Sequence, residues 1–322
     1  MKPTISVLIP TYNRAGILRE TLEAMSKVER SGLSADFVVI DNNSKDNTKN
    51  VVDLFKDRLP ILYLFEPRQG KSCALNKALE EVELGEIVVF TDDDVMPHTD
   101  WLKQIADSCR RNPEYALGGG KVITAWPGNR EPEWLRFSKT SCGLRGHDLG
   151  QHEMLYPDDN CPIGPNFWIR RYLFENGLRF DESIGPSTIK RAMGEETYLL
   201  NKLKHDGYKI VYCPDSILHH RLQKSLITPR GIQHRAYTMG RGSARIKFLC
   251  YTEINHNHKL SFLLRRACAL GFACLRLLIA YLSFSQARRI GRSIDPIVDI
   301  AYNWELLTGE NIYSNHKQKT NV

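Results

Sequence analysis

The sequence lacks several features that mark common classes of protein. Its eight cysteines form no C-x-x-C pair and follow no regular spacing, which argues against a disulfide framework or a zinc site and predicts reduced thiols. There is no long basic run and no RNA-binding aromatic signature, so we expect no nucleic-acid partner despite a net charge of +7. No charged and then apolar leader opens the chain, so a secretory signal is not expected.

Two phosphate-binding motifs are also missing. No G-x-G-x-x-G follows the first apolar run, and no Walker loop appears. Both absences weaken the case for a dinucleotide-dependent dehydrogenase or a P-loop NTPase. A chain of 322 residues with an ordinary composition is long enough for one large domain, or for a domain with an appendage.

The first third of the chain contains a regular alternation of apolar runs and amphipathic segments. Leu18, Leu22 and Met25, for example, follow the first run at helical spacing. Strands that alternate with helices from residue 5 to about residue 110 predict an α/β fold, with a mostly parallel sheet flanked by helices. The four runs that we expect to form strands are residues 5–9, 37–40, 61–65 and 87–90.

Three consecutive carboxylates, Asp92, Asp93 and Asp94, stand at the end of the fourth run. They repel one another, and a divalent cation would relieve that repulsion. Aspartate oxygens suit Mg²⁺ or Mn²⁺, and such ions usually bind together with substrate phosphates. Ligands of open α/β sheets bind at the carboxyl ends of the strands, where Asp41 also falls. The alternative is a solvated acidic turn with an aspartate at a helix N-cap, and the triplet alone leaves both open.

Several short motifs follow one another along the chain. They are VLIPTYNR (7–14), VIDNNS (39–44), GKSCALN (70–76), TDDD (91–94), GPN (164–166), GEET (194–197), Pro214 and the pair His219 and His220. In this order the motifs resemble those of the family-2 glycosyltransferases of GT-A fold. The resemblance covers roughly residues 4 to 245 and is specific for the family, but not for a sugar. It implies inverting, metal-dependent transfer from a nucleotide-diphosphate sugar, with a UDP-sugar as the expected donor, to a hydroxyl of a glycan or lipid-linked acceptor.

The resemblance assigns binding roles at these motifs. It implies that Asp92 and Asp94 hold Mn²⁺ or Mg²⁺, with Asp94 as the more direct ligand. The family places a histidine six residues after its proline, which selects His220, although the neighbouring His219 keeps that assignment open. Both follow a strand-like run and an expected turn at residues 214–216. The residues implied to bind the nucleotide sugar are Pro10, Thr11, Tyr12, Asn13, Asp41, Asn43, Arg68, Lys71, Asp92 and Asp93.

Inverting transfer also needs a base that takes the proton of the attacking hydroxyl. The resemblance places it in the pair Glu195 and Glu196, and the second residue is the expected base. The commoner family pattern is Glu-Asp, so the longer Glu196 leaves the position of its carboxylate less certain. Alternatively, both glutamates are first-turn acids favoured by the helix dipole. The residues implied to face the acceptor are Gly164, Pro165, Asn166 and Trp168, of which Trp168 either stacks on a sugar or belongs to the core.

The later chain is less regular. Residues 124–162 are rich in glycine and proline, and such an irregular insert near an active site often selects the acceptor. The expected parts are a catalytic domain over 1–245 (a nucleotide-sugar half over 1–115 and an acceptor half over 116–245), a helical region over 246–314 and a disordered tail over 315–322.

The stretch 260–292 is apolar at its centre and basic at its flanks. Residues 267–284 approach the length of a membrane span, but Arg276 near the middle would cost about 2.5–3.5 kcal/mol there. The alternatives are amphipathic helices on an anionic membrane, helices packed on the catalytic domain, and a true span, of which we favour the first. We therefore expect a cytoplasmic protein with peripheral contact to the inner face of the cell membrane.

Two other functions remain open beside sugar transfer. A nucleotidyltransferase that makes a nucleotide sugar would want a glycine-rich phosphate loop with a lysine near the first strand, which is absent. A non-catalytic scaffold that binds nucleotide sugars or glycans would tolerate loss of the aspartate triplet or of the acidic pair, and both are present. Metal-dependent binding of UDP discriminates between these functions.

Overall fold

The computed structural model describes residues 4–185, 192–251 and 259–308. The chain forms two compact units, each of which is discontinuous in sequence. We call them the sheet unit, which comprises Met1–Trp126, Arg145–Ile189 and Glu195–Leu222, and the helical unit, which comprises Pro127–Leu144, Lys190–Gly194 and Gln223–Val322.

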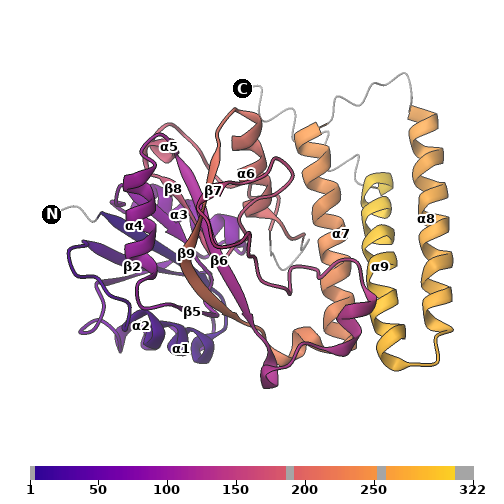
Figure 1. Cartoon of the computed structure of the whole chain (residues 1–322), viewed down its shortest axis with the longest axis horizontal. Coiled ribbons are helices and arrows are strands. Elements are labelled where there is room, and N and C mark those ends of the chain that lie inside the picture. The colour runs from indigo at the N-terminus through magenta and orange to yellow at the C-terminus, as the bar shows by residue number, and fades with distance from the viewer. Residues whose placement is uncertain (1–3, 186–191, 252–258, 309–322) are drawn as a thin grey trace. The chain divides into compact units, whose positions relative to one another are not determined.

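A mostly parallel sheet forms the centre of the sheet unit (Figure 1), which confirms the expected α/β fold. Its first four strands in space, in the order β3, β2, β1 and β4, are all parallel to their neighbours. They are β1 (Ile5–Thr11), β2 (Ala35–Asp41), β3 (Ile61–Phe65) and β4 (Ile87–Phe90), and each contains one predicted run. The sheet continues through β8 (Phe167–Arg170), β6 (Leu117–Ala125), β9 (Ile210–Arg221) and β5 (Val95–Pro97), and β7 (Met154–Leu155) pairs with β9.

Helices cover both faces of this sheet because both faces of its central strands are apolar. In β1, Val7 and Ile9 join the core on one face, whereas Leu8 joins the core on the other. The first core is closed by α1 (Ala15–Met25), α2 (Thr48–Asp53) and α4 (Trp101–Arg111). The second is closed by α3 (Lys71–Glu81), α5 (Tyr172–Glu175) and α6 (Glu195–His205).

The carboxyl ends of β1, β2 and β4 meet at one edge of the sheet. Thr11 pairs with Asp41, and Leu8 pairs with Phe90, so the loops that follow these strands open side by side. The aspartate triplet begins two residues after Phe90, directly after Thr91, and so lies at this edge. We call it the carboxyl edge.

Strand β9 differs from the expected strand and turn. It continues through Pro214 to Arg221. Its pairing with β6 passes from Gly120–Cys213 directly to Lys121–Ile217, so residues 214–216 form a bulge instead of a turn. Proline is tolerated at a bulge because no ladder hydrogen bond is needed there. The continued strand carries His219 and His220 to a pairing with β5.

The helical unit consists mainly of α7 (Pro229–Tyr251), α8 (Lys259–Tyr281) and α9 (Gln286–Thr308), with α9 between the other two (Figure 1). The expected domain boundary at residue 245 falls inside α7. Within the described ranges, no helix combines the length and the apolarity that a membrane crossing requires. The predicted tail, 315–322, lies outside the described residues. Short helices of this unit are η1 (Pro127–Asn129), η2 (Glu133–Phe137) and η3 (Lys224–Ile227).

Part of the irregular insert belongs to the helical unit, because residues 127–144 pack on α9. Asp295 of α9 accepts hydrogen bonds from the N–H groups of Lys139 (2.9 Å) and Thr140 (3.0 Å). Gly291 lets α9 approach η2, since a Cβ there would lie 2.1 Å from the carbonyl oxygen of Trp134. Long-range contacts of this kind leave no periodic signal in the insert.

Candidate active site

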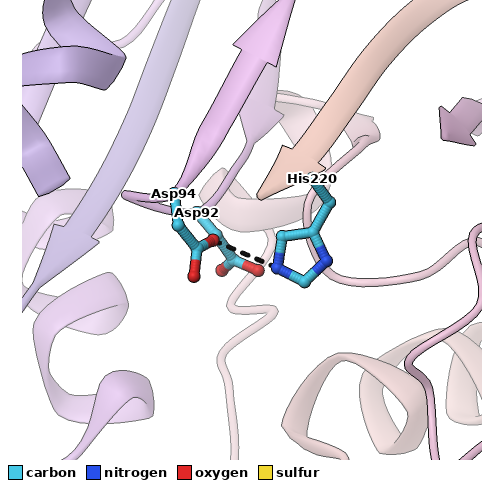
Figure 2. Close-up of side chains that lie close together, drawn as sticks. All are labelled: Asp92, Asp94 and His220. Atoms are coloured by element: carbon cyan, nitrogen blue, oxygen red, sulfur yellow. Dashed lines mark ion pairs between the residues drawn. The ribbon is translucent and has the colours of Figure 1, made fainter. Parts of the chain in front are cut away.

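Asp92, Asp94 and His220 lie together at the carboxyl edge (Figure 2). Each offers one ligand atom, and the three atoms lie within 4.8 Å of one another. The aspartates follow β4, and His220 reaches them because it pairs with Val95, the residue after Asp94. The next N–H along β9, that of Arg221, donates to the carbonyl oxygen of Asp94 at 2.8 Å. The short strand β5 therefore brings the imidazole to the aspartates.

The surroundings of Asp94 suit a cation. Its Oδ1 is buried and lies 3.1 Å from Nε2 of His220, yet it makes no hydrogen bond with the described residues. Its Oδ2 accepts a hydrogen bond of 3.0 Å from Arg14. Carboxylate oxygens are the ligands that Mn²⁺ and Mg²⁺ prefer, and a protein imidazole is a common metal ligand. A divalent cation therefore fits these residues.

Arg14, which the sequence reading did not include in the site, holds two members of the triplet. Its Nη1 lies 2.8 Å from Oδ1 of Asp93 and 3.0 Å from Oδ2 of Asp94. Thr11 Oγ1 donates to the other oxygen of Asp93 at 2.7 Å, so Asp93 is buried and anchors the loop. The position of Arg14, directly after the PTYN stretch, is the signal that could have pointed to it.

The three aspartates have different electrostatic surroundings. Burial, opposed by Arg14, raises the pKa of Asp93 to about 6. Burial would also raise the pKa of Asp94, but His220, Arg14 and Lys71 hold it below its usual value. Asp94 is thus ionised at neutral pH, as a metal ligand must be.

Lys71 connects the aspartates to the acidic pair. Lys71 is the first residue of α3. Its Nζ donates to Oδ1 of Asp92 at 2.8 Å and lies 3.2 Å from Oε1 of Glu195. Burial would lower the pKa of Lys71, but Asp92, Glu195 and Glu196 raise it well above its usual value. Lys71 therefore remains charged and neutralises part of this acidic cluster.

Glu196 has a strongly perturbed carboxyl group. Burial, and then the negative charge of Glu195, raise its pKa to about 8, while Lys71 opposes the shift. A Cβ at Gly164 would lie 3.3 Å from Oε1 of Glu196 and 3.6 Å from Nζ of Lys71, so glycine lets the backbone approach both groups. A carboxylate whose pKa is near neutral is suited to accepting a proton.

The loops after β1 and β2 are joined by hydrogen bonds. The N–H of Asn13 donates to Oγ of Ser44 at 2.8 Å, and the N–H of Lys45 donates to Oδ1 of Asn13 at 2.7 Å. Asp41 is buried and accepts from the N–H of Ser44 (2.8 Å) and from the hydroxyl of Tyr63 (2.7 Å). The structure thus brings most of the expected nucleotide-binding residues to the carboxyl edge, namely Pro10, Thr11, Tyr12, Asn13, Asp41 and Asn43.

Asn42, which was also missed as a site residue, fixes the loop before α3. Its Nδ2 donates to the carbonyl oxygen of Arg68 at 2.6 Å, and its Oδ1 accepts from the N–H of Gly70 at 2.7 Å. This loop leads into Lys71. The guanidinium of Arg68 itself is exposed and pairs with Glu66 (3.0 Å) and Glu182 (3.1 Å).

The expected acceptor-side residues are buried. Asn166 Nδ2 donates to the carbonyl oxygens of Lys121 (3.0 Å) and Ser216 (2.8 Å), and thereby braces β6 against the bulge of β9. Trp168 is 1% exposed and packs at Gly118, where a Cβ would lie 2.6 Å from the ring, so the core alternative holds for it. Gly164 faces Glu196 as described, and Pro165 beside it is buried.

Known proteins resemble this chain in sequence and in fold. Glycosyltransferase AglE of Haloferax volcanii is 34% identical over 218 residues, which are 67% of this chain and 66% of the relative. The probable glycosyltransferase YdaM of Bacillus subtilis is 30% identical over 224 residues, which are 67% of this chain and 50% of that protein. The chain thus spans between half and two thirds of the length of these relatives.

A solved structure agrees with the GT-A fold. The mannosyltransferase PcManGT from Pyrobaculum calidifontis, in complex with GDP-Man and Mn²⁺, superposes with a TM-score of 0.58 at 21% identity. The superposition covers 96% of this chain and 88% of that one. The profile described as glycosyl transferase family 2 matches residues 6–178, more than half of the sequence. The chain belongs to glycosyl transferase family 2.

Proposed function

We propose that this chain is an inverting, metal-dependent glycosyltransferase of polysaccharide or glycoconjugate biosynthesis. It moves a sugar from a nucleotide-diphosphate sugar, with a UDP-sugar as the first donor to test, to a hydroxyl of a glycan or lipid-linked acceptor. One observation carries the proposal: Lys71 contacts both Asp92, which lies with Asp94 and His220, and Glu195, which precedes Glu196. Ligands for a cation and a candidate base thus lie on the two sides of one lysine.

The donor is assigned to the carboxyl edge. Asp92, Asp94 and His220 would hold Mn²⁺ or Mg²⁺, which, when bound, neutralises the charge that develops on the departing nucleoside diphosphate. Lys71 adds a fixed positive charge beside them. The remaining residues proposed to bind the nucleotide sugar are Pro10, Thr11, Tyr12, Asn13, Asp41, Asn43, Arg68 and Asp93.

Glu196 is assigned as the base, and its burial, together with the negative charge of Glu195, holds its pKa high. The hydroxyl oxygen of the acceptor attacks the anomeric carbon, the bond from that carbon to phosphate breaks, and Glu196 takes the hydroxyl proton. The attack and the departure occur on opposite faces of the carbon, so its configuration inverts. Gly164 supports this role because its lack of a side chain lets the loop that is expected to face the acceptor come close to Oε1 of Glu196.

Nucleotide binding with and without metal tests the proposal. We expect UDP or GDP to bind in the presence of Mn²⁺ and to lose affinity when EDTA removes it. Asp94→Ala should abolish the metal-dependent part of nucleotide binding, and His220→Ala should weaken Mn²⁺ binding because it removes a proposed ligand. His219→Ala is the matched control, because His219 lies on the opposite face of β9 from His220. This variant should bind Mn²⁺ as tightly as the wild type does. Metal-independent nucleotide binding, or no binding, would contradict the proposal.

Product analysis separates the alternative functions. A glycosyltransferase releases a nucleoside diphosphate from a nucleotide sugar, even when water replaces the acceptor. A nucleotidyltransferase instead releases pyrophosphate from a nucleoside triphosphate and a sugar phosphate. A non-catalytic scaffold binds the nucleotide sugar and releases neither product.

A peripheral membrane contact through residues 260–292, on the cytoplasmic face of the cell membrane, is part of the proposal. It agrees with a lipid-linked acceptor. Arg276, which argued against a membrane span, pairs with Asp299 of α9 at 2.7 Å, so its charge is met inside the helical unit. Cosedimentation with vesicles tests this contact independently of sugar transfer.

A further inference from the structure

From Leu264 onward, helix α8 carries an exposed apolar face that continues to Leu282, just after the end of the helix. Most of its members recur three or four residues apart, and Leu278 and Leu282 are 66% and 77% exposed. The buried alanines Ala273 and Ala280 mark the other side of the helix, which packs on α9. Exposed apolar patches of this kind are typical of interaction surfaces. The face comprises Leu264, Cys268, Phe272, Leu275, Leu278, Ile279 and Leu282.

The surroundings of this face are basic. Residues 259–294 contain one lysine and six arginines and no aspartate or glutamate. Two of the arginines turn toward α9, where Arg276 pairs with Asp299 and Arg266 donates to Oδ1 of Asn303 at 3.4 Å. The exposed face therefore remains apolar, and positive charge flanks it. This combination is typical of helices that lie in a membrane interface.

A shallow hollow lies where α8 turns into α9. It has a volume of about 340 Å³. Arg288 and Arg292 are one helical turn apart on α9, and within the described part of the chain neither forms an ion pair. Arg289 Nη2 donates to the carbonyl oxygen of Ser283 at 3.2 Å and so fixes the turn. The hollow is lined by Ile279, Leu282, Ser283, Phe284, Ser285, Arg288 and Arg292.

We propose that this hollow binds the headgroup phosphate of an anionic phospholipid, while the apolar face of α8 enters the acyl layer. The planar guanidinium groups of Arg288 and Arg292 match phosphate oxygens in pairs. Phe284, whose side chain is fully exposed, and Leu282 lie at the same turn and would be the deepest anchors. The proposal rests on the membrane contact of the proposed function and names its lipid and its residues.

Charge favours a membrane over a second copy of this chain as the occupant. A second copy would bring the same acid-free, basic surface and a net charge of +7, so the two surfaces would repel each other. An anionic bilayer offers both the apolar layer and the negative charge. Analytical ultracentrifugation checks for a dimer formed through this face. A wild-type dimer that becomes a monomer in the Leu278→Ser/Leu282→Ser variant would overturn the proposal.

Vesicle cosedimentation of the full chain tests the site. We expect binding to phosphatidylcholine vesicles that contain phosphatidylglycerol, and much weaker binding to pure phosphatidylcholine. Arg288→Ala/Arg292→Ala should weaken the first by roughly 30-fold, since each basic residue near an anionic surface contributes about a factor of five. Arg19→Ala/Lys103→Ala removes two exposed charges from the sheet unit and should leave binding unchanged. Equal effects of the two double variants would overturn the site.

Two further double variants separate the contribution of the arginines from that of the apolar face of α8. Arg288→Lys/Arg292→Lys keeps the charge but loses the paired geometry, so weaker binding supports a phosphate site and unchanged binding overturns it. Leu278→Ser/Leu282→Ser should weaken binding to both kinds of vesicle. If the wild type binds neither vesicle, both the headgroup site and the membrane contact fail, whereas metal-dependent nucleotide binding without vesicles still tests sugar transfer. If vesicle binding persists in the arginine variants, only the headgroup site fails.

Discussion

Lys71 and Asp92 are joined by a hydrogen bond of 2.8 Å from Nζ to Oδ1, which connects the start of α3 to the end of β4. The same Nζ lies 3.2 Å from Glu195. The charge of Lys71 thus compensates the negative charge of Asp92, which is assigned to the cation. It also compensates that of Glu195, which precedes the assigned base. Because these groups share a lysine, a change of charge on one side is felt on the other.

Replacing Lys71 should destabilise the fold in a pH-dependent way. Lys71→Met leaves Asp92, Glu195 and Glu196 without their shared cation, and we expect a loss of about 2–4 kcal/mol at pH 7.5. The loss should grow at pH 9, because Glu196, whose pKa is about 8, is then ionised and adds to the repulsion. Urea unfolding at both pH values measures it. Lys77→Met on the same helix removes only the surface pair with Glu81 and should change stability by less than about 0.5 kcal/mol. Equal losses in the two variants would contradict the role of Lys71.

Arg14 should act on metal affinity by orienting Asp94. It binds Oδ2 of Asp94 and leaves Oδ1 toward His220. Arg14→Ala should therefore weaken Mn²⁺ binding about 10- to 100-fold, as loss of a residue that orients a ligand typically does. Calorimetric titration with MnCl₂ in the presence of UDP measures the affinity, and Arg19→Ala on the exposed side of α1 is the control. A gain in affinity would show that Arg14 acts mainly by repelling the cation.

Sugar transfer should become faster as the pH rises through the pKa of Glu196. The base must be ionised, and with a pKa near 8 it is mostly protonated at pH 7. We expect kcat at saturating donor to rise roughly tenfold from pH 7 to pH 9, and Glu196→Gln to be nearly inactive while it still binds nucleotide. A flat pH profile, or an active Glu196→Gln enzyme, would require another base.

The same carboxyl group should lower the stability of the folded chain. Its folded pKa lies above the usual glutamate value, so the unfolded chain loses this proton at a lower pH than the folded chain does. Stability therefore falls as the pH rises from about 4.5 to about 8. Glu196→Gln should melt at a higher temperature than the wild type, by a margin that widens from pH 5 to pH 8. A constant margin would mean that the effect is not ionic.

Glu305 gives the helical unit the opposite pH dependence. Burial would raise its pKa, but hydrogen bonds from Arg241 (2.7 Å) and Arg245 (2.8 Å) hold it below its usual value. This stabilisation is complete above the ordinary glutamate pKa and is lost as the pH falls through the lowered one. Glu305→Gln should cost about 1–3 kcal/mol at pH 7 and less at pH 4, as measured by thermal unfolding. Glu133→Gln, in an exposed pair with Arg136, should show no such difference.

The alternating part of the fold follows from the sequence for a simple reason. Strands β1, β2 and β4 are buried on both faces and so appear as apolar runs, and each is followed by polar residues that end it. The edge strand β3 is apolar as well, although Leu62 and Phe65 are exposed. The order of strands therefore predicts that Asp41, Asp92 and Asp94 lie at the same edge, whereas only the family resemblance implied that His220 joins them. The hydrogen-bond partners of these residues could not be predicted in this way. The pairing of Arg14 with Asp94, for example, depends on side-chain directions that the spacing of residues in the sequence does not determine.

The less predictable parts depend on long-range contacts. Nothing near Pro214 in sequence shows that β6 pairs on both sides of a bulge, so a turn was the natural interpretation. The insert likewise gives no sign that Trp134 is buried in the helical unit, since Asp295 and Gly291 lie far along the chain. For Trp168, burial decides between two alternatives that composition left open.

The path of residues 127–144 constrains how the protein is made. The ribosome completes the last segment of the sheet unit at Leu222. At that point Trp134 and Leu135 have no packing partner, because α9 is synthesised near the end of the chain. During that interval the nascent chain displays an indole and a leucine that the finished protein conceals. A shortened gene that stops after Leu222 would make this exposure permanent, so its product should aggregate even though every strand of the sheet is present.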